Sequence, residues 1–248
     1  MSRFKAAGIH LLLSVLIASV AVCVMVFVWY PPPLFTLLGG LGLLLLITGC
    51  DVIIGPLLTL VVFKSGKKSL KFDLSVIALL QISALMYGVY VMAIARPAYV
   101  VFVKDRFELV SIADVDPAEW GKAKEPRFQV APWTGPEFIG AVMPEDRDEK
   151  EKVLFLAVSG VDLQQLPRYY VGYERVAPEA AKAAQPLKEL RRLNAGKQAI
   201  IDSEIARLGL KEEQIGFLPV NHRRGAVTAL VQRESGKVLE FVELNPWP

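Results

Sequence analysis

Side chains that bind metals or form disulfides are scarce in this sequence. Its 248 residues include two cysteines, Cys23 and Cys50, and two histidines, His10 and His222. No histidine, cysteine or second carboxylate stands at ligand spacing from either cysteine, so we expect no disulfide, no metal and no cofactor. The P-loop, GxGxxG, HExxH, CxxC and GxSxG motifs are also missing. The sequence thus offers no catalytic residues, and we do not expect an enzyme.

Charge is nearly absent from the first third of the chain. Residues 1–97 hold seven of the 28 Lys and Arg residues and two of the 25 Asp and Glu residues. Within this region, residues 9–30 and 74–95 carry no charge and residues 34–63 carry one. Each run exceeds the roughly 20 residues that cross a ~30 Å hydrocarbon layer. We therefore predict a three-helix transmembrane domain over 1–97, surrounded by membrane lipid, and a separate domain over 98–248.

The basic residues near the runs predict the orientation. Arg3 and Lys5 precede the first run, and a segment with four lysines, residues 64–71, joins the second to the third. Because lysine and arginine favour the cytoplasmic side, we expect a cytoplasmic N-terminus and a periplasmic C-terminal domain in a bacterial inner membrane. The first run is long and lacks a small-residue cleavage site, which favours an uncleaved span. Since the basic residues flank spans, nucleic acid is not an expected partner.

Residues 98–248 are numerous enough to form one domain with its own core. Asp116 before Pro117 predicts a helix start, and Gly209 predicts a helix end. The patterns predict strands at 98–111 and 152–160, helices at 178–197 and 197–210, and a β-hairpin at 225–244. We expect an α+β domain with an antiparallel sheet.

Asp51 stands in the middle of the second apolar run. On a helix it shares one face of small or polar residues with Thr48, Gly55 and Thr59. Gln81, Ala84 and Gly88 form a comparable stripe in the third run. A charged side chain at mid-bilayer costs a few kcal/mol and normally faces a partner. Two readings stay open: Asp51 holds its own bundle together through Gln81, or it meets a polar group on another protein's helix.

Two weaker clusters lie in the C-terminal domain. The segment "LPRYYVGYE" contains Tyr169, Tyr170 and Tyr173. These tyrosines form either a binding platform or a packed edge of the domain. The residues just before the predicted hairpin are His222, Arg223 and Arg224. They form either an anion-binding group or a solvated loop. Both are candidate periplasmic contacts.

Several segments resemble those of a known family. They are "MSRFKAAGIHLLLS", "GCDVIIGPLLTLVVF", the stretch from "KSLKFDLSV" to "KDRFELV", "LPRYYVGYE" and the C-terminal "NHRRGAVTALVQRESGKVLEFVELNPWP". In these the chain is similar to the TfpX/TfpZ family of type IV pilin accessory proteins. The resemblance runs from the first span to the C-terminus and leaves out about 120–150.

The resemblance implies an inner-membrane accessory or chaperone that binds the major type IV pilin and assists its stability or assembly into pili. The pilus assembly machinery is a further implied partner. A pilin waits in the membrane as one apolar helix with a positively charged N-terminus, so Asp51 gains a candidate partner. Asp51 lies 13 residues before Lys64, about 20 Å of helix, and the pilin N-terminus has to reach that depth.

Two other functions compete with this one. The first is a non-catalytic subunit or an enzyme of pilin modification or processing, although a lone carboxylate is poorly equipped for hydrolysis. The second is a transporter, for which three spans without an inverted repeat are a poor basis.

Overall fold

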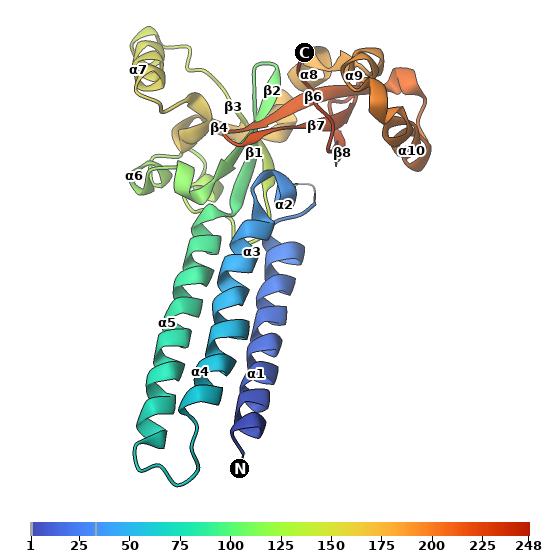
Figure 1. Cartoon of the computed structure of the whole chain (residues 1–248). Helices are drawn as coiled ribbons and strands as arrows, with labels where there is room; N and C mark the ends of the chain where they lie inside the picture. Colours follow the sequence, from blue (N-terminus) through green and yellow to red (C-terminus); the bar gives the residue numbers. More distant parts are fainter. Residues whose placement is uncertain (1, 33) are drawn as a thin grey trace. The chain divides into compact units, whose positions relative to one another are not determined.

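The computed structural model describes residues 2–32 and 34–248, with the side chains of residues 43, 46, 47 and 50 excepted. The chain forms two compact units (Figure 1). A helical unit contains residues 1–31 and 39–96, and a mixed unit contains residues 32–38 and 97–248. Residues 32–38, predicted to belong to the membrane domain, therefore fold with the C-terminal part of the chain.

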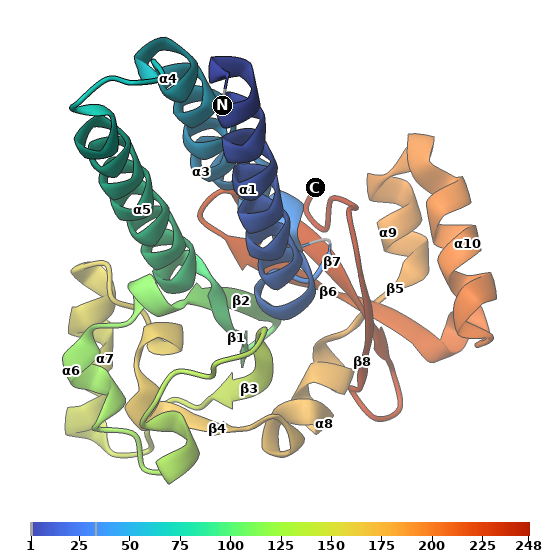
Figure 2. The ribbon, with the colours of Figure 1, turned by 90° about the horizontal axis from the view of Figure 1, so that it is seen from below.

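The helical unit consists of long apolar helices. Helix α1 (Arg3–Val24) continues into a π-helical turn (Met25–Trp29). After it the chain returns through α3 (Gly40–Gly49), a second π-helical turn (Cys50–Ile54) and α4 (Gly55–Val62). Helix α5 (Leu70–Ala95) then runs in the same direction as α1 (Figures 1 and 2).

The prediction of three membrane-spanning helices is wrong. Within the described residues, two helices are long and apolar enough to cross a membrane, Arg3–Trp29 with 27 residues and Leu70–Ala95 with 26. The predicted span at 34–63 is divided instead. Gly39 takes a positive φ of 71° between α2 (Leu34–Leu37) and α3, and the π-helical turn interrupts the α-helical pattern before Pro56, which has no amide proton.

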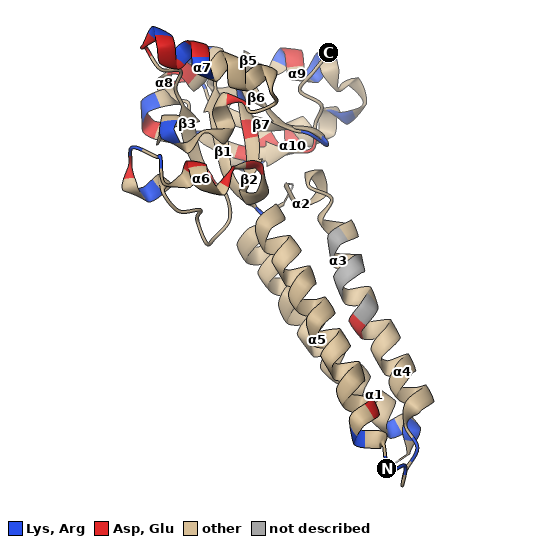
Figure 3. Cartoon of the chain, turned by 90° about the vertical axis from the view of Figure 1, so that its left-hand side faces the viewer, with Lys and Arg blue, Asp and Glu red and all other residues tan. Residues whose placement is uncertain are grey.

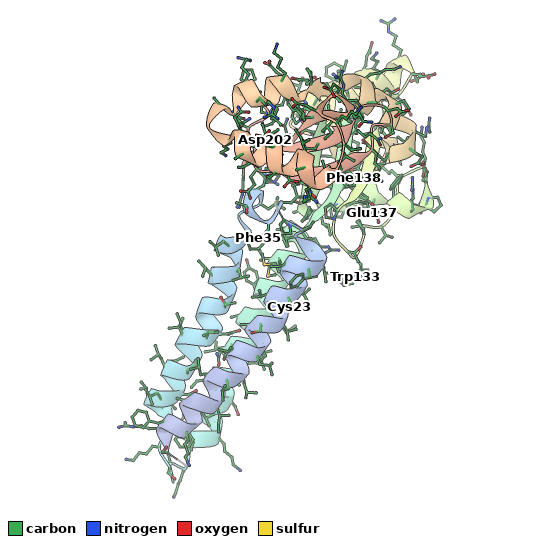
Figure 4. The ribbon with its side chains drawn as sticks, turned by 90° about the vertical axis from the view of Figure 1, so that its right-hand side faces the viewer. Cys23, Phe35, Trp133, Glu137, Phe138 and Asp202 are labelled. Carbon is green, nitrogen blue, oxygen red and sulfur yellow. The ribbon has the colours of Figure 1, made fainter. Side chains whose placement is uncertain are left out.

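The two long helices expose most of their large apolar side chains. Leu12, Phe27 and Leu79 are examples, with 71%, 83% and 65% of their surface accessible. Figure 4 shows such side chains along the unit, with Cys23 labelled on α1, where it is exposed. The Cys50 side chain lies outside the described residues. Lys and Arg gather at the end that holds the N-terminus (Figure 3). These features are compatible with membrane anchoring.

The mixed unit is built on one eight-stranded sheet with the order β4-β3-β1-β2-β6-β7-β8, and β5 pairs with β6. The strands are β1 (Pro97–Val103), β2 (Arg106–Ser111), β3 (Glu137–Ala141), β4 (Tyr170–Gly172), β5 (Gln185–Pro186), β6 (Ile215–His222), β7 (Gly225–Gln232) and β8 (Val238–Val242). The predicted purely antiparallel sheet is wrong, because β1 pairs with β3 and β2 with β6 in parallel. The α+β class and the β7–β8 hairpin are confirmed.

Short helices connect and cover the strands of this unit. They are α6 (Pro117–Trp120), α7 (Arg147–Val158), α8 (Tyr173–Ala183), α9 (Leu187–Leu193) and α10 (Gln198–Leu208). The Asp116 carboxylate accepts a hydrogen bond from the Ala118 amide at 2.8 Å, and Gly209 closes α10 with a φ of 65°, so both predicted signals are confirmed. The strand predicted at 152–160 is wrong, since most of it lies in α7.

Two groups of buried side chains form the core of the mixed unit. In the first, Tyr99 on β1 packs edge-on against Phe128 and Tyr170, with ring centroids 6.0 and 5.3 Å apart. In the second, Leu187 and Leu190 of α9 pack with Phe217 of β6 and their neighbours. The aromatic pairs contribute about 1 kcal/mol each beyond the area they bury.

Candidate partner-binding site

The polar face predicted around Asp51 lies inside the helical unit. Asp51, Gly55 and Thr59 are buried at i, i+4 and i+8, with 7% of Asp51 and 3% of Thr59 accessible. Thr48 is half-buried and donates its hydroxyl hydrogen to the Leu44 carbonyl at 2.8 Å. Its hydroxyl therefore serves its own helix, while the other three residues face the neighbouring helices.

His10 of α1 joins this face from a distant part of the sequence. Its Nδ1 lies 2.6 Å from the Thr59 hydroxyl of α4. Ser14, one turn further along α1, is also buried. The face predicted from the sequence did not include His10. The signal available was the spacing of Ala6, His10 and Ser14 at i, i+4 and i+8, which places small and polar side chains on one face.

Gln81 of α5 reaches the same place through space that Gly55 leaves open. Its Nε2 donates a hydrogen bond to the Asp51 carbonyl at 3.4 Å. A Cβ atom at position 55 would lie 2.0 Å from this nitrogen, so the contact requires glycine. Gly88, two turns further along α5, is buried as well. Residues from α1, α4 and α5 thus surround Asp51.

The Asp51 carboxyl group faces a pocket of about 270 Å³ that His10, Ser14 and Gln81 also line. Its Oδ1 is buried, and no hydrogen-bond partner for it exists within residues 2–32 and 34–248. Over the same residues, no group of three His, Cys, Asp or Glu side chains could hold a metal ion. The pocket therefore combines largely apolar walls with one carboxylate, an arrangement that suits a cation or a strong hydrogen-bond donor.

The three candidate tyrosines of the mixed unit pack into its interior. Tyr169 and Tyr170 are buried, and the Tyr170 hydroxyl donates to the Gln164 carbonyl at 2.5 Å. The half-buried Tyr173 packs against Phe107 and donates to the Gly236 carbonyl at 2.5 Å. Burial raises the pKa of Tyr170 and of Tyr173. Their hydroxyl groups are thus used within the fold.

His222, Arg223 and Arg224 hold the turn between β6 and β7 in place. Arg223 forms an ion pair with Asp114, and the Arg224 guanidinium donates to the Leu38 carbonyl at 2.8 Å. Burial is the main reason why the pKa of His222 is lowered. Arg223 and Arg224 thus already bind groups of their own unit.

A polar pocket of about 210 Å³ lies beside this turn, lined by Glu108, Asp114, Gln165, His222 and Arg223 among others. Burial raises the pKa of Glu108, whose carboxylate accepts a hydrogen bond from Asn221 at 3.2 Å.

Comparisons with known proteins were made for the whole chain. The family model described as "Fimbrial assembly protein FimB" matches residues 1–39. The fimbrial assembly proteins of Dichelobacter nodosus serogroups I and E1 are each 32% identical over 244 residues, which cover 97% of this chain and 95% of the relative. The protein of serogroups C1 and C2 is 41% identical over 113 residues, 45% of this chain and 86% of its own length. No solved structure matches the chain significantly.

The comparisons support a family of pilus assembly proteins. They do not single out the TfpX/TfpZ family within it. Two relatives align with nearly the whole chain, so both the helical and the mixed unit have counterparts in them. On this evidence the chain belongs to the family of the fimbrial assembly proteins.

Proposed function

We propose that the protein is a membrane accessory protein of pilus assembly, of the TfpX/TfpZ kind, that binds the major type IV pilin and assists its stability or assembly without acting as an enzyme. The relatives are named for fimbrial assembly, and this supports the process. The observation that carries the binding role is the buried Asp51 carboxyl group, whose Oδ1 lacks a partner within the described residues of the helical unit.

The proposal includes an orientation in the inner membrane. Helices α1 and α5 run in the same direction, and the Tyr30 hydroxyl after α1 donates to the Met92 carbonyl near the end of α5 at 2.9 Å. Their basic N-terminal ends, at Arg3 and Lys71, therefore lie on one side. By the preference of basic residues this side is the cytoplasm, so residues 97–248 follow α5 into the periplasm.

The test is a pull-down of the full chain from native membranes in a mild detergent. The wild type is compared with Asp51→Asn and with Asp73→Asn, a control at the lysine-rich end where Asp73 pairs with Lys67 at 2.6 Å. We expect pilin with the wild type and the control, and at least about tenfold less with Asp51→Asn, since the lone carboxylate is the proposed ligand.

The mass of the retained pilin separates the competing functions. A chaperone returns pilin of unchanged mass, whereas a modifying or processing enzyme changes the pilin mass when the accessory protein is present. Absence of pilin from every sample would contradict the proposed function.

A further inference from the structure

A groove runs along the helical unit between α1 and α5. Both helices pack on the returning α3–α4 segment, and an apolar pocket of about 410 Å³ remains between them. This pocket shares Ile17 and Leu85 with the pocket of about 270 Å³ at Asp51. The two pockets therefore adjoin each other between the two helices, and together we call them the α1/α5 groove.

The two ends of the α1/α5 groove differ in chemistry. From Ile17 to Trp29 its walls are apolar, and Val20 in this part is 58% exposed. This part is about 18 Å long at ~1.5 Å of rise per residue. At the other end stand His10, Gln81 and Asp51. An occupant that matches both parts has a long apolar body and one polar, positively charged end.

The charge of the occupant follows from Asp51. This side chain is more than nine-tenths buried and lines the groove, and Oδ1 lacks a hydrogen-bond partner inside the described part of the chain. Among apolar surroundings an isolated carboxylate costs a few kcal/mol, and an ammonium group placed beside it offsets this cost.

We infer that the α1/α5 groove seats the apolar helix of a single-span partner with its N-terminal α-ammonium group against Asp51. The identity of this partner as the pilin rests on the proposed function. A lysine ammonium on its long stem would reach back to the membrane surface, whereas an α-ammonium is fixed to the helix end. The positive end of the helix dipole adds to its attraction for the carboxylate.

The position of Asp51 along the helices sets the height at which the partner is held. Asp51 lies eleven residues before the end of α4 at Val62, about 17 Å from the lysine-rich end of the unit. This is roughly half of a ~30 Å hydrocarbon layer. A helix whose N-terminus sits at Asp51 is thus raised by half a bilayer from the position of a full span. The groove holds its partner partly withdrawn toward the periplasm.

The experiment measures binding of a defined probe by the full chain in lipid nanodiscs. The probe is a Leu/Ala-rich helical peptide of about 20 residues with a free N-terminal amine and a C-terminal fluorophore. Its twin carries an acetyl group on the amine and differs in nothing else. We expect the free amine to bind the wild type at least about tenfold more tightly than the acetylated twin.

Three variants assign the binding to the groove. Asp51→Asn removes the preference for the free amine. Val20→Trp fills the apolar part without touching Asp51 and weakens both peptides. Leu12→Trp is the matched control on α1, because Leu12 is 71% exposed and lines neither pocket, and it leaves binding unchanged. A thermal unfolding curve for each variant verifies that it is folded.

Equal binding of the two peptides by the wild type, or no binding of either, would overturn the inference. So would a groove occupied by lipid or by a second copy of this chain, detected by cross-linking from position 20. The pull-down reports separately on the proposed function. If Val20→Trp and Asp51→Asn retain as much pilin as the wild type, the pilin contact lies elsewhere. If the peptide binds through its free amine but no pilin is captured, the groove binds another partner.

Discussion

Gly55 is a position where one added methyl group changes the contacts of Asp51. A Cβ there would overlap the Gln81 amide, which has to move away from the Asp51 carbonyl. Since the flexible Gln81 side chain can move aside, we expect Gly55→Ala to lower the free energy of unfolding by about 1 kcal/mol, the contribution of the lost hydrogen bond. Thermal unfolding of the full chain in mild detergent measures this.

Two further variants make this prediction specific. Gly49→Ala is the control, because a Cβ at position 49 meets nothing within 4 Å, and it leaves stability unchanged or raises it by up to about 1 kcal/mol. In Gly55→Ala with Gln81→Ala the methyl group finds space and the hydrogen bond is already absent, so we expect the double variant to be no less stable than Gln81→Ala alone. Additive losses would show that Gln81 is not the residue displaced.

His222 makes the stability of the mixed unit depend on pH. Burial chiefly lowers its pKa, the Asp114 carboxylate opposes this, and Arg223 and Arg224 reinforce it. The folded state therefore favours the neutral ring. This contribution is complete above the ordinary pKa of about 6.5 and decreases as the pH falls below it.

We expect the wild type to lose more stability than His222→Gln between pH 7.5 and 5.5, measured by thermal unfolding. Glu108 lines the same pocket and, with its raised pKa, has the opposite dependence. The difference between wild type and variant isolates the histidine, since Glu108 is present in both. Parallel pH profiles would mean that the ring titrates alike in the folded and unfolded chains.

At the scale of elements, the β7–β8 hairpin depends on Gly236. Its φ is 73°, and a Cβ would lie 2.0 Å from the Ala177 carbonyl oxygen of α8. We expect Gly236→Ala to destabilise the protein by about 3 kcal/mol or more, because the atom it meets belongs to the backbone. Gly160 has a φ of 90°, but a Cβ there would meet nothing within 4 Å. We therefore expect Gly160→Ala to destabilise the protein by about 1 kcal/mol. Chemical denaturation measures the stability of both variants. Equal losses of stability would show that the clash with α8 has no effect.

The elements that sequence patterns predict correctly are those with local causes. The Asp116 cap, the Gly209 helix end and the β7–β8 hairpin each depend on residues within a few positions. The segment 152–160 has the composition of a buried strand. However, the Asp146 carboxylate accepts a hydrogen bond from the Glu149 amide at 2.9 Å and caps a helix that includes most of this segment. The parallel pairs β1–β3 and β2–β6 join strands far apart in sequence, which a local pattern does not reveal.

The candidate site shows the same division. The spacing of Asp51, Gly55 and Thr59 predicts one helix face, because helical periodicity is local. The contact between His10 and Thr59 depends on how α1 packs on α4, 49 residues away in sequence. Similarly, an apolar run of 30 residues predicts a single span, while the break at Gly39 and the π-helical turn depend on the folded chain.

At the scale of the whole molecule, the proposed orientation predicts which residues a membrane-impermeant thiol reagent reaches. In a chain with Cys23→Ser and Cys50→Ser, single cysteines replace the exposed Ser65, between α4 and α5, or the exposed Ser235, in the β7–β8 turn. With the outer membrane permeabilised, we expect Ser235→Cys to be labelled at once and Ser65→Cys only after lysis. The reverse pattern would place residues 97–248 in the cytoplasm.

The hydrogen bond between His10 and Thr59 also has a consequence for biosynthesis. At about 5–20 residues per second, Thr59 is made roughly 2–10 seconds after His10. During this interval the His10 imidazole has no access to the hydroxyl that it binds in the finished protein. A polar group without a partner inside the hydrocarbon layer costs free energy. The contact that fixes the first helix to α4 therefore forms only after the returning segment has been made.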